Sequence, residues 1–389
     1  MSDLHPSLKL LRVLAGEGRF HVYRLLRDRR VFLFTKCLLT TFACFRGRGS
    51  ETDARSIAFV KGSNQLRYFR HAQAQLEDEL GALQVYASAP IPTASDALLL
   101  PRISFSAFAQ QVAYLLVMLL TGKRRYLNLY LLAFVSASRK AVRTGWRNIE
   151  SFVCLNDQPY DAAAIVHALN GRKNCRTIVV QHGLILSKDF YFPTVAKEFW
   201  AWGELSKQHY RAWDKGAQLM VKGRYREDAN KKADDFVCHP ADRLIQILIA
   251  PSFFHSEVKE ILAEVDRVLS TELKAKVRVA IKFHPATKLL WWLRWQCRQY
   301  AAWLKEEHEP MEHLATQYDL LVTKNSTSAV DFLLLGKPVM FSILSDALFP
   351  SCDYGLTFDD AKDFGLKSSE LFMKKNKARL KFLKFALNV

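Results

Sequence analysis

Short apolar segments alternate with longer helical segments from residue 56 onward, and this alternation limits the possible folds more than any other feature. Strands separated by helices are typical of a parallel sheet covered on both faces. In the first half we expect strands at residues 56–60, 84–87, 177–180 and 198–202, and helical segments at 65–80, 105–152 and 161–169. This half therefore predicts a doubly wound α/β domain.

A second series of the same kind follows a polar, charged segment, EDANKKADDFVCHPAD at residues 227–242, where we place the domain linker. Here we expect strands at residues 244–250, 277–283, 318–322 and 339–343, and helices at 257–273, 289–307 and 326–335. With 389 residues, the chain is long enough for two or three domains. We predict a basic N-terminal helical segment (1–55), an N-terminal Rossmann-like domain (56–230), a C-terminal Rossmann-like domain (240–365) and a basic amphipathic tail (366–389).

The net charge of +18 is concentrated in three segments. Residues 1–50 carry +7, residues 101–149 carry +8 without any acidic residue, and residues 366–389 carry +6, so the rest of the chain is slightly acidic. Two of these segments contain apolar runs, VFLFTKCLLTTFACF at 31–45 and FSAFAQQVAYLLVMLL at 105–120. Both are shorter than the roughly 20 apolar residues that a spanning helix needs.

Basic residues beside apolar helical faces suit an in-plane anchor on an anionic leaflet. The alternative is that the apolar runs are core helices and the charges a solvated face. Three coinciding segments favour the membrane, and we expect a cytoplasmic protein that is peripheral on the inner membrane. Nucleic acid is not expected, since no zinc-finger spacing or RNP-like aromatic motif accompanies the charge.

Seven cysteines without CxxC spacing, and an opening segment interrupted by charges, predict reduced, buried thiols and no secretory signal. We also find no DxD motif at a strand end that would suggest a bound metal.

Polar residues collect where the expected strands end, the place where ligands bind in open α/β sheets. The first group is TKNSTS, in which Asn325, Ser326, Thr327 and Ser328 lie between a strand and a helix. Hydroxyls and first-turn amides there can hold a phosphate. Simple helix capping would need one hydroxyl, so three in a row favour the phosphate.

His284, two residues after Lys282, is the second candidate, because an imidazole at a strand end can donate to a leaving phosphate oxygen. The third is His182 in QHG, which could act as a general base towards an acceptor hydroxyl. Both histidines could instead be structural. The fourth, Gly336-Lys337-Pro338, reads mostly as a helix end, although Asp331 one turn earlier could reach ribose or sugar hydroxyls.

The order of these motifs carries more information than each one alone. The run TIVVQHG, FWAWGELSKQHY, VKGRY, LIQILIAPS, VAIKFHP and YDLLVTKNSTSAVDFLLLGKPVMF resembles bacterial capsule and surface-carbohydrate glycosyltransferases. That group includes polysialyltransferases, capsule Kdo transferases and, more distantly, CDP-glycerol glycerophosphotransferases. The likeness covers roughly residues 152–343 and touches FVKGSNQLRYF near residue 59.

This resemblance implies a GT-B fold, in which two Rossmann-like domains face each other across a cleft: an acceptor domain at 56–230 and a nucleotide-donor domain at 240–365. It also implies a metal-independent reaction without a bound cofactor. It implies that His284, Ser326, Thr327 and Ser328 hold the phosphate of a nucleotide donor, and that His182 is the acceptor-side histidine. Polysialyltransferases use an acidic pair before a glycine as base, and this sequence has none. Glu204 is a carboxylate that could substitute for it or serve a structural role.

The sequence thus predicts a glycosyltransferase that moves a sugar from a nucleotide-activated donor, preferably a CMP-sugar, to a surface or capsular glycan or a lipid-linked glycan. UDP and CDP donors remain open. Alternative functions are polyol-phosphate transfer, UDP-sugar 2-epimerisation and a non-catalytic role in polysaccharide assembly.

Overall fold

The computed structural model divides the chain into two compact units, Met1–Glu227 and Asp228–Val389. It describes residues 30–46, 54–87, 98–99, 103–157, 159–183, 194–213, 217–222, 244–251, 255–268, 277–283, 300, 303–324, 326–341 and 356–357. The division falls at the start of the polar segment in which the sequence places the linker. The limits predicted for the domains and for the tail stay predictions.

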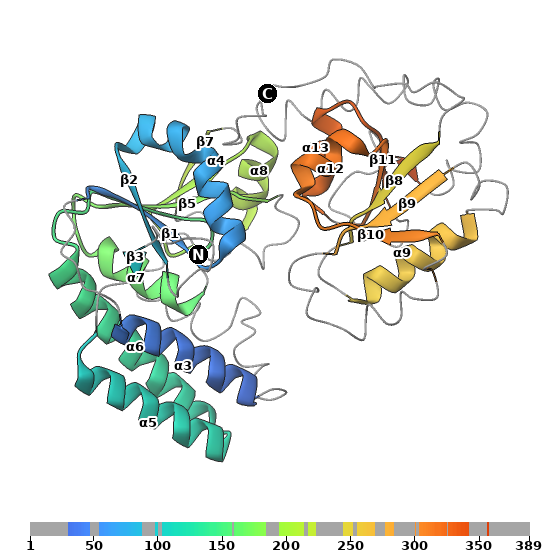
Figure 1. The fold of residues 1–389 in the computed structure, drawn as a ribbon. Helices are drawn as coiled ribbons and strands as arrows, with labels where there is room; N and C mark the ends of the chain where they lie inside the picture. Colours follow the sequence, from blue (N-terminus) through green and yellow to red (C-terminus); the bar gives the residue numbers. More distant parts are fainter. Residues whose placement is uncertain are drawn as a thin grey trace. The chain divides into compact units, whose positions relative to one another are not determined.

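Unit 1 contains a seven-stranded parallel sheet within the described residues, in the order β3-β2-β1-β4-β5-β6-β7 (Figure 1). Its strands are β1 (Ser56–Val60), β2 (Leu83–Ala87), β3 (Leu98–Leu99), β4 (Ser151–Cys154), β5 (Arg176–Val180), β6 (Glu198–Ala201) and β7 (Gln218–Val221). All side chains of β1, β4 and β6 are buried, as expected for central strands of a doubly wound sheet.

Helices cover both faces of this sheet. They are α3 (Arg30–Arg46), α4 (Ser63–Leu80), α5 (Phe105–Thr121), α6 (Arg124–Gly145), α7 (Tyr160–Asn170) and α8 (Glu204–Trp213). Leu66 and Phe69 of α4 pack with Ala58 and Val60 on one face. The opposite face packs against α7, and α6, α3 and α5 form a further helical layer beyond it (Figure 1).

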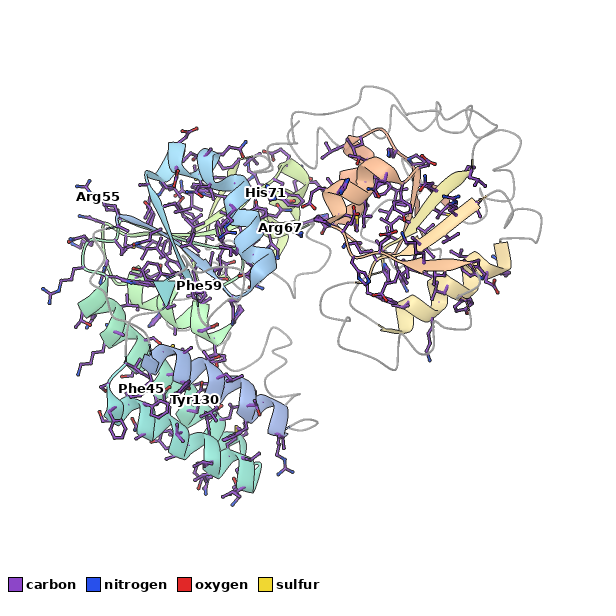
Figure 2. The ribbon with its side chains drawn as sticks, viewed as in Figure 1. Phe45, Arg55, Phe59, Arg67, His71 and Tyr130 are labelled. Carbon is purple, nitrogen blue, oxygen red and sulfur yellow. The ribbon has the colours of Figure 1, made fainter. Side chains whose placement is uncertain are left out.

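The three helices α3, α5 and α6 share a core with the rest of unit 1. Phe45 of α3 stacks on Phe108 of α5 with ring centroids 4.5 Å apart. Tyr130 of α6 is fully buried and makes hydrogen bonds with Thr41 (3.1 Å) and Tyr160 (3.2 Å) (Figure 2). The helices that contain the two apolar runs therefore pack one face into the core of unit 1. No helix in the described parts of the chain is long and apolar enough to cross a membrane.

Unit 2 contains a six-stranded parallel sheet within its described residues, in the order β10-β9-β8-β11-β12-β13. Its strands are β8 (Ile245–Ile249), β9 (Val277–Ile281), β10 (Leu304–Glu306), β11 (Leu320–Thr323), β12 (Val339–Phe341) and β13 (Leu356–Thr357). Its helices are α9 (His255–Val268), α12 (Met311–Gln317) and α13 (Ser328–Leu334). Two parallel-sheet α/β domains confirm the predicted fold class.

Two predicted helices were wrong in part. The helical region at 105–152 is two helices followed by β4, because Gly122 adopts φ 64° and ends α5 with a left-handed turn, and α6 stops before Phe152. In the segment 289–307, which was predicted to be one helix, residues 304–306 form strand β10 instead, which pairs with β9. Residues 289–299 lie outside the described part of the chain.

Candidate active site

His182 lies at the carboxyl edge of the unit 1 sheet, two residues after β5. The buried Gln181 side chain holds this loop: its Oε1 accepts the Trp202 backbone N–H (2.8 Å) and its Nε2 donates to the Gly183 carbonyl (2.8 Å). Tyr68 of α4 donates to the Gln181 carbonyl (3.1 Å). The ends of β5 and β6 and helix α4 thus fix the position of His182.

The imidazole of His182 is neutral at physiological pH. Surrounding protein removes water from the ring and lowers the pKa of His182 from 6.5 to about 4, while a hydrogen bond to the Leu155 backbone acts in the opposite direction. The side chain also keeps an exposed surface, so water there reduces the size of the shift without changing its direction. A neutral, positioned imidazole is the form that a general base requires.

The carboxyl edge of the unit 2 sheet holds the described residues of the predicted phosphate site. Lys282 follows β9, and its Nζ donates to the Glu309 carbonyl. Thr323 ends β11 and donates to the Ala250 carbonyl after β8 (2.7 Å). Because β9, β8 and β11 are neighbours, Lys282 and the residues after Thr323 lie about 10 Å apart, or two strand spacings.

Ser326, Thr327 and Ser328 begin α13. The Ser326 hydroxyl is hydrogen-bonded to the Ser328 hydroxyl and accepts the Ser328 backbone N–H (3.3 Å). Thr327 occupies the N-cap position but makes no side-chain capping bond. Of these hydroxyls, that of Ser326 takes part in capping the helix and that of Thr327 does not. Both residues are partly accessible to solvent. Asp331 lies one turn later in α13 and is half-buried.

Two predicted site residues, His284 and Asn325, lie outside the described part of the chain, so their roles stay predictions. Glu204 pairs with Lys207 within α8 (2.8 Å), a contact that fits the structural role considered for it. Gly336 adopts φ 68° after α13, as its predicted helix-ending role requires. The described residues contain no group of three His, Cys, Asp or Glu side chains that could hold a metal.

A shallow cavity of about 440 Å³ lies at the opposite, amino edge of the unit 1 sheet. It is lined by Arg55, Arg147, Asn148, Ile149, Glu150 and Asn174. Since ligands of open α/β sheets bind at the carboxyl ends of the strands, the candidate active site is the carboxyl edge at His182 and not this cavity.

Sequence reasoning missed the residues that position His182. The importance of Gln181 and Tyr68 comes from contacts across the fold, which residue spacing does not show. It also missed Lys61 directly after β1 and Asp161 at the start of α7, which form an ion pair of 2.5 Å. A signal for Lys61 was present, because a charged residue immediately after a fully apolar strand marks a strand end.

Comparison with known proteins places this geometry in context. No family model matches the sequence. A teichoic acid glycerol-phosphate primase of Bacillus spizizenii is 27% identical over 151 residues, which cover 34% of this chain and 38% of the primase. The match thus spans less than half of that relative's length.

Solved structures extend the similarity over most of the chain. The wall teichoic acid polymerase TagF, soaked with CDPG, matches with a TM-score of 0.51 and 13% identity over 97% of this chain and 92% of that one. A UDP-GlcNAc 2-epimerase of Neisseria meningitidis bound to UDP-GlcNAc matches with a TM-score of 0.50 and 11% identity over 82% of this chain and 94% of that one. The chain therefore has the GT-B fold.

Proposed function

We propose that this protein transfers a glycosyl or polyol-phosphate group from a nucleotide-activated donor to a surface-glycan acceptor. The observation that carries the proposal is His182, a neutral imidazole held at the carboxyl edge of a GT-B sheet by Gln181 and the Leu155 backbone. In this reaction His182 takes the proton of the acceptor hydroxyl as that oxygen attacks the donor, and the nucleotide leaves with its phosphate.

Unit 2 supplies the donor side in this proposal. His284, Lys282, Asn325 and the hydroxyls of Ser326, Thr327 and Ser328 contact the donor phosphates, and Asp331 contacts its sugar. The charge that develops on the leaving phosphate is stabilised by positioned donors, which is a major term in transfer reactions of this kind. The reaction needs no bound metal or cofactor in this account.

A CMP-sugar is the favoured donor on the sequence resemblance, and a capsular or lipid-linked glycan is the favoured acceptor. The names of the primase and of TagF add support for a second candidate, transfer of a polyol phosphate from a CDP-activated donor. Both candidates share a cytidine nucleotide as leaving group. The fold likeness to an epimerase keeps UDP-sugar epimerisation as the rival reaction.

A nucleotide-binding screen tests this proposal on the full chain. We expect CMP or CDP to raise the melting temperature, because a ligand at 100 times its Kd stabilises the folded state by about 2.7 kcal/mol. UDP as the strongest ligand would favour the epimerase reaction, and product analysis with a UDP-sugar would then show an epimerised donor without transfer. No effect of any nucleotide at millimolar concentration would favour a non-catalytic assembly partner.

We further propose that helices α3, α5 and α6 bind an anionic membrane surface, so that the enzyme works as a peripheral protein on the inner membrane. Of the nine large apolar side chains that are exposed in the described residues, eight belong to these helices: Val31, Leu39, Phe42, Phe105, Leu116, Leu120, Leu129 and Leu132. On α5 the exposed Phe105, Leu116 and Leu120 follow helical spacing, so they form one stripe.

The charge of these helices supports the same partner. Their sequences contain no Asp or Glu, and α6 exposes Arg124, Arg125, Arg139, Lys140 and Arg143. Exposed apolar side chains combined with basic residues are the features that bind amphipathic helices to anionic bilayers. The predicted basic tail at 366–389 lies outside the described residues, and its contribution stays a prediction.

A further inference from the structure

The carboxyl end of β1 carries a lysine that has no part in the reaction as described so far. The chain leaves β1 through α4 towards β2, and it leaves the neighbouring β4 through α7 towards β5. Because α4 and α7 cover opposite faces, β1 and β4 form the topological switch point of the sheet. Ligands of doubly wound sheets bind at this point.

Lys61 follows β1 directly and bonds to Asp161 in the first turn of α7, with Nζ and Oδ1 2.5 Å apart. Asp161 is fully buried, and its Oδ1 also accepts the Ala162 backbone N–H (3.0 Å). The second oxygen, Oδ2, is buried without a hydrogen-bond partner. A buried polar atom without a partner costs about 1–3 kcal/mol, so this pair is a poor device for stability alone.

The ammonium of Lys61 remains accessible from solvent. Its side chain is 25% exposed, whereas that of Asp161 is 0% exposed, so a ligand meets the cation and not the carboxylate. The Lys61 backbone N–H donates to Gln65 Oε1 (2.8 Å), which fixes the turn. Beside it, a Cβ added to Gly62 would meet nothing within 4 Å, so there is open space at this turn.

Helix α4 begins at the same turn and adds further donors. Gly62 is its N-cap residue and provides no side-chain capping bond. The first amides of a helix and its dipole favour an anion. The accessible charge at the switch point is therefore the Lys61 cation, beside the first turn of α4, while the Asp161 carboxylate beneath it is fully buried.

This turn lies close to His182. Phe59 pairs with Cys154, and Cys154 with Val179, so Lys61, Asn156 and Gln181 stand at one level across the sheet. Two strand spacings, about 10 Å, separate the β1 and β5 ends. Tyr68 of α4 also bonds to the carbonyl of Gln181 (3.1 Å). Lys61 thus lies about two strand spacings from the end of the strand that precedes His182.

We propose that Lys61, held by Asp161, binds an anionic group of the acceptor, a phosphate or a carboxylate, and thereby places the acceptor hydroxyl at His182. The inference rests on the proposed transfer reaction. Lys61 is a binding residue for the acceptor, and Asp161 is a positioning residue that acts through Lys61.

Binding of small anionic probes to the full chain tests the site. We expect glycerol 1-phosphate or glucuronate to bind at least tenfold more tightly than uncharged glycerol in calorimetric or NMR titrations, and the better probe distinguishes a phosphate from a carboxylate acceptor. Lys61→Gln should weaken that binding at least tenfold, and Lys61→Arg should retain most of it. Equal affinities in Lys61→Gln and the parent protein would overturn the proposal, as would equal binding of all three probes.

Asp161→Asn separates positioning from a structural role. We expect it to bind the anionic probe at least threefold more weakly, because a neutral amide attracts the Lys61 ammonium less than a carboxylate does and so holds it less firmly in place. A lower melting temperature with unchanged probe affinity would show a purely structural pair and overturn the proposal. CMP and CDP are titrated on the same samples, so that the anion site and the proposed transfer reaction can fail separately. If neither nucleotide binds but the anionic probe still binds through Lys61, the transfer reaction is excluded and the anion site stands.

Discussion

At the scale of single residues, the position of His182 depends on side chains that sequence patterns do not show. The apolar run before the QHG motif predicted that His182 lies at the end of a strand, and the structure places it after β5. Gln181 orients the loop through hydrogen bonds to residues 183 and 202. The contact with Trp202 forms only when β5 and β6 pair in the folded sheet. The sequence therefore predicts the place of His182 but not the hydrogen bonds that position its loop.

The lowered pKa of His182 predicts a pH dependence of stability. Because the folded protein lowers the pKa of His182 below its value of 6.5 in the unfolded state, the unfolded state binds more protons over the pH range just below 6.5. The contribution is complete above pH 6.5 and is lost as the pH falls towards 4. In urea titrations at pH 7 and 5, we expect the parent protein to lose more stability than His182→Gln. Equal losses in both proteins would contradict the shift.

Gln111 predicts a stabilising substitution. Its side chain is fully buried in α5, and neither of its polar atoms has a hydrogen-bond partner. Gln111→Leu should raise the free energy of unfolding by about 1 kcal/mol, because the cost of the unpartnered amide disappears. The matched control is Gln110→Leu, since Gln110 is exposed and donates to the Tyr114 hydroxyl (3.2 Å). A gain in the control as large as that in Gln111→Leu would show a general effect of hydrophobicity instead.

The four cysteines in the described residues test the prediction of reduced, buried thiols, which came from their number and spacing. Cys37, Cys44, Cys154 and Cys175 are all buried and free. Burial raises the pKa of Cys44 to about 12 and that of Cys175 to about 11, so both remain protonated and unreactive at neutral pH. The expectation of reduced, buried thiols is confirmed for these four.

At the scale of helices and strands, most buried apolar strands were predictable, but the buried central strand β4 and the strands at the sheet edges were not. The limits of β1 match the predicted 56–60, because SIAFV is a continuous apolar run between polar residues. β3, β7 and β13 were missed because two of them contain two residues and the third is only half-buried. β4 and β10 were missed because they lie in the segments 105–152 and 289–307, which were predicted to be helical. Helices α8 and α12 were also missed, since they are short and polar.

The α5 stripe predicts where membrane binding is lost. Leu116→Asp with Leu120→Asp should reduce flotation with vesicles containing anionic lipid at least tenfold, because inserting one Leu is worth about 1.5–3 kcal/mol. Both side chains are exposed, 45% and 80%, so the fold should tolerate the change. Ala74→Asp with Gln75→Asp on the exposed face of α4 is the control for added charge. Undiminished flotation of the α5 variant would exclude this stripe as the contact.

At the scale of the whole molecule, the order of motifs predicted the GT-B fold even though the two solved structures described above are only 13% and 11% identical to this chain. Fold follows from the sequence of strands, helices and strand-end residues, which survives extensive substitution. Donor and acceptor identity depends instead on the few side chains that line the site, and neither strand periodicity nor charge distribution specifies them. The nucleotide base and the transferred group therefore need experiment.

Transfer itself is the most direct test of the central claim. With the donor nucleotide identified by binding, product formation on a membrane-derived acceptor is compared between the parent protein and His182→Gln. We predict that one nucleotide is released for each group transferred, and that His182→Gln lowers kcat by about 10²–10⁴, the contribution of a general base, without weakening nucleotide binding. An unchanged kcat in His182→Gln, or donor turnover without any transferred group, would contradict the account.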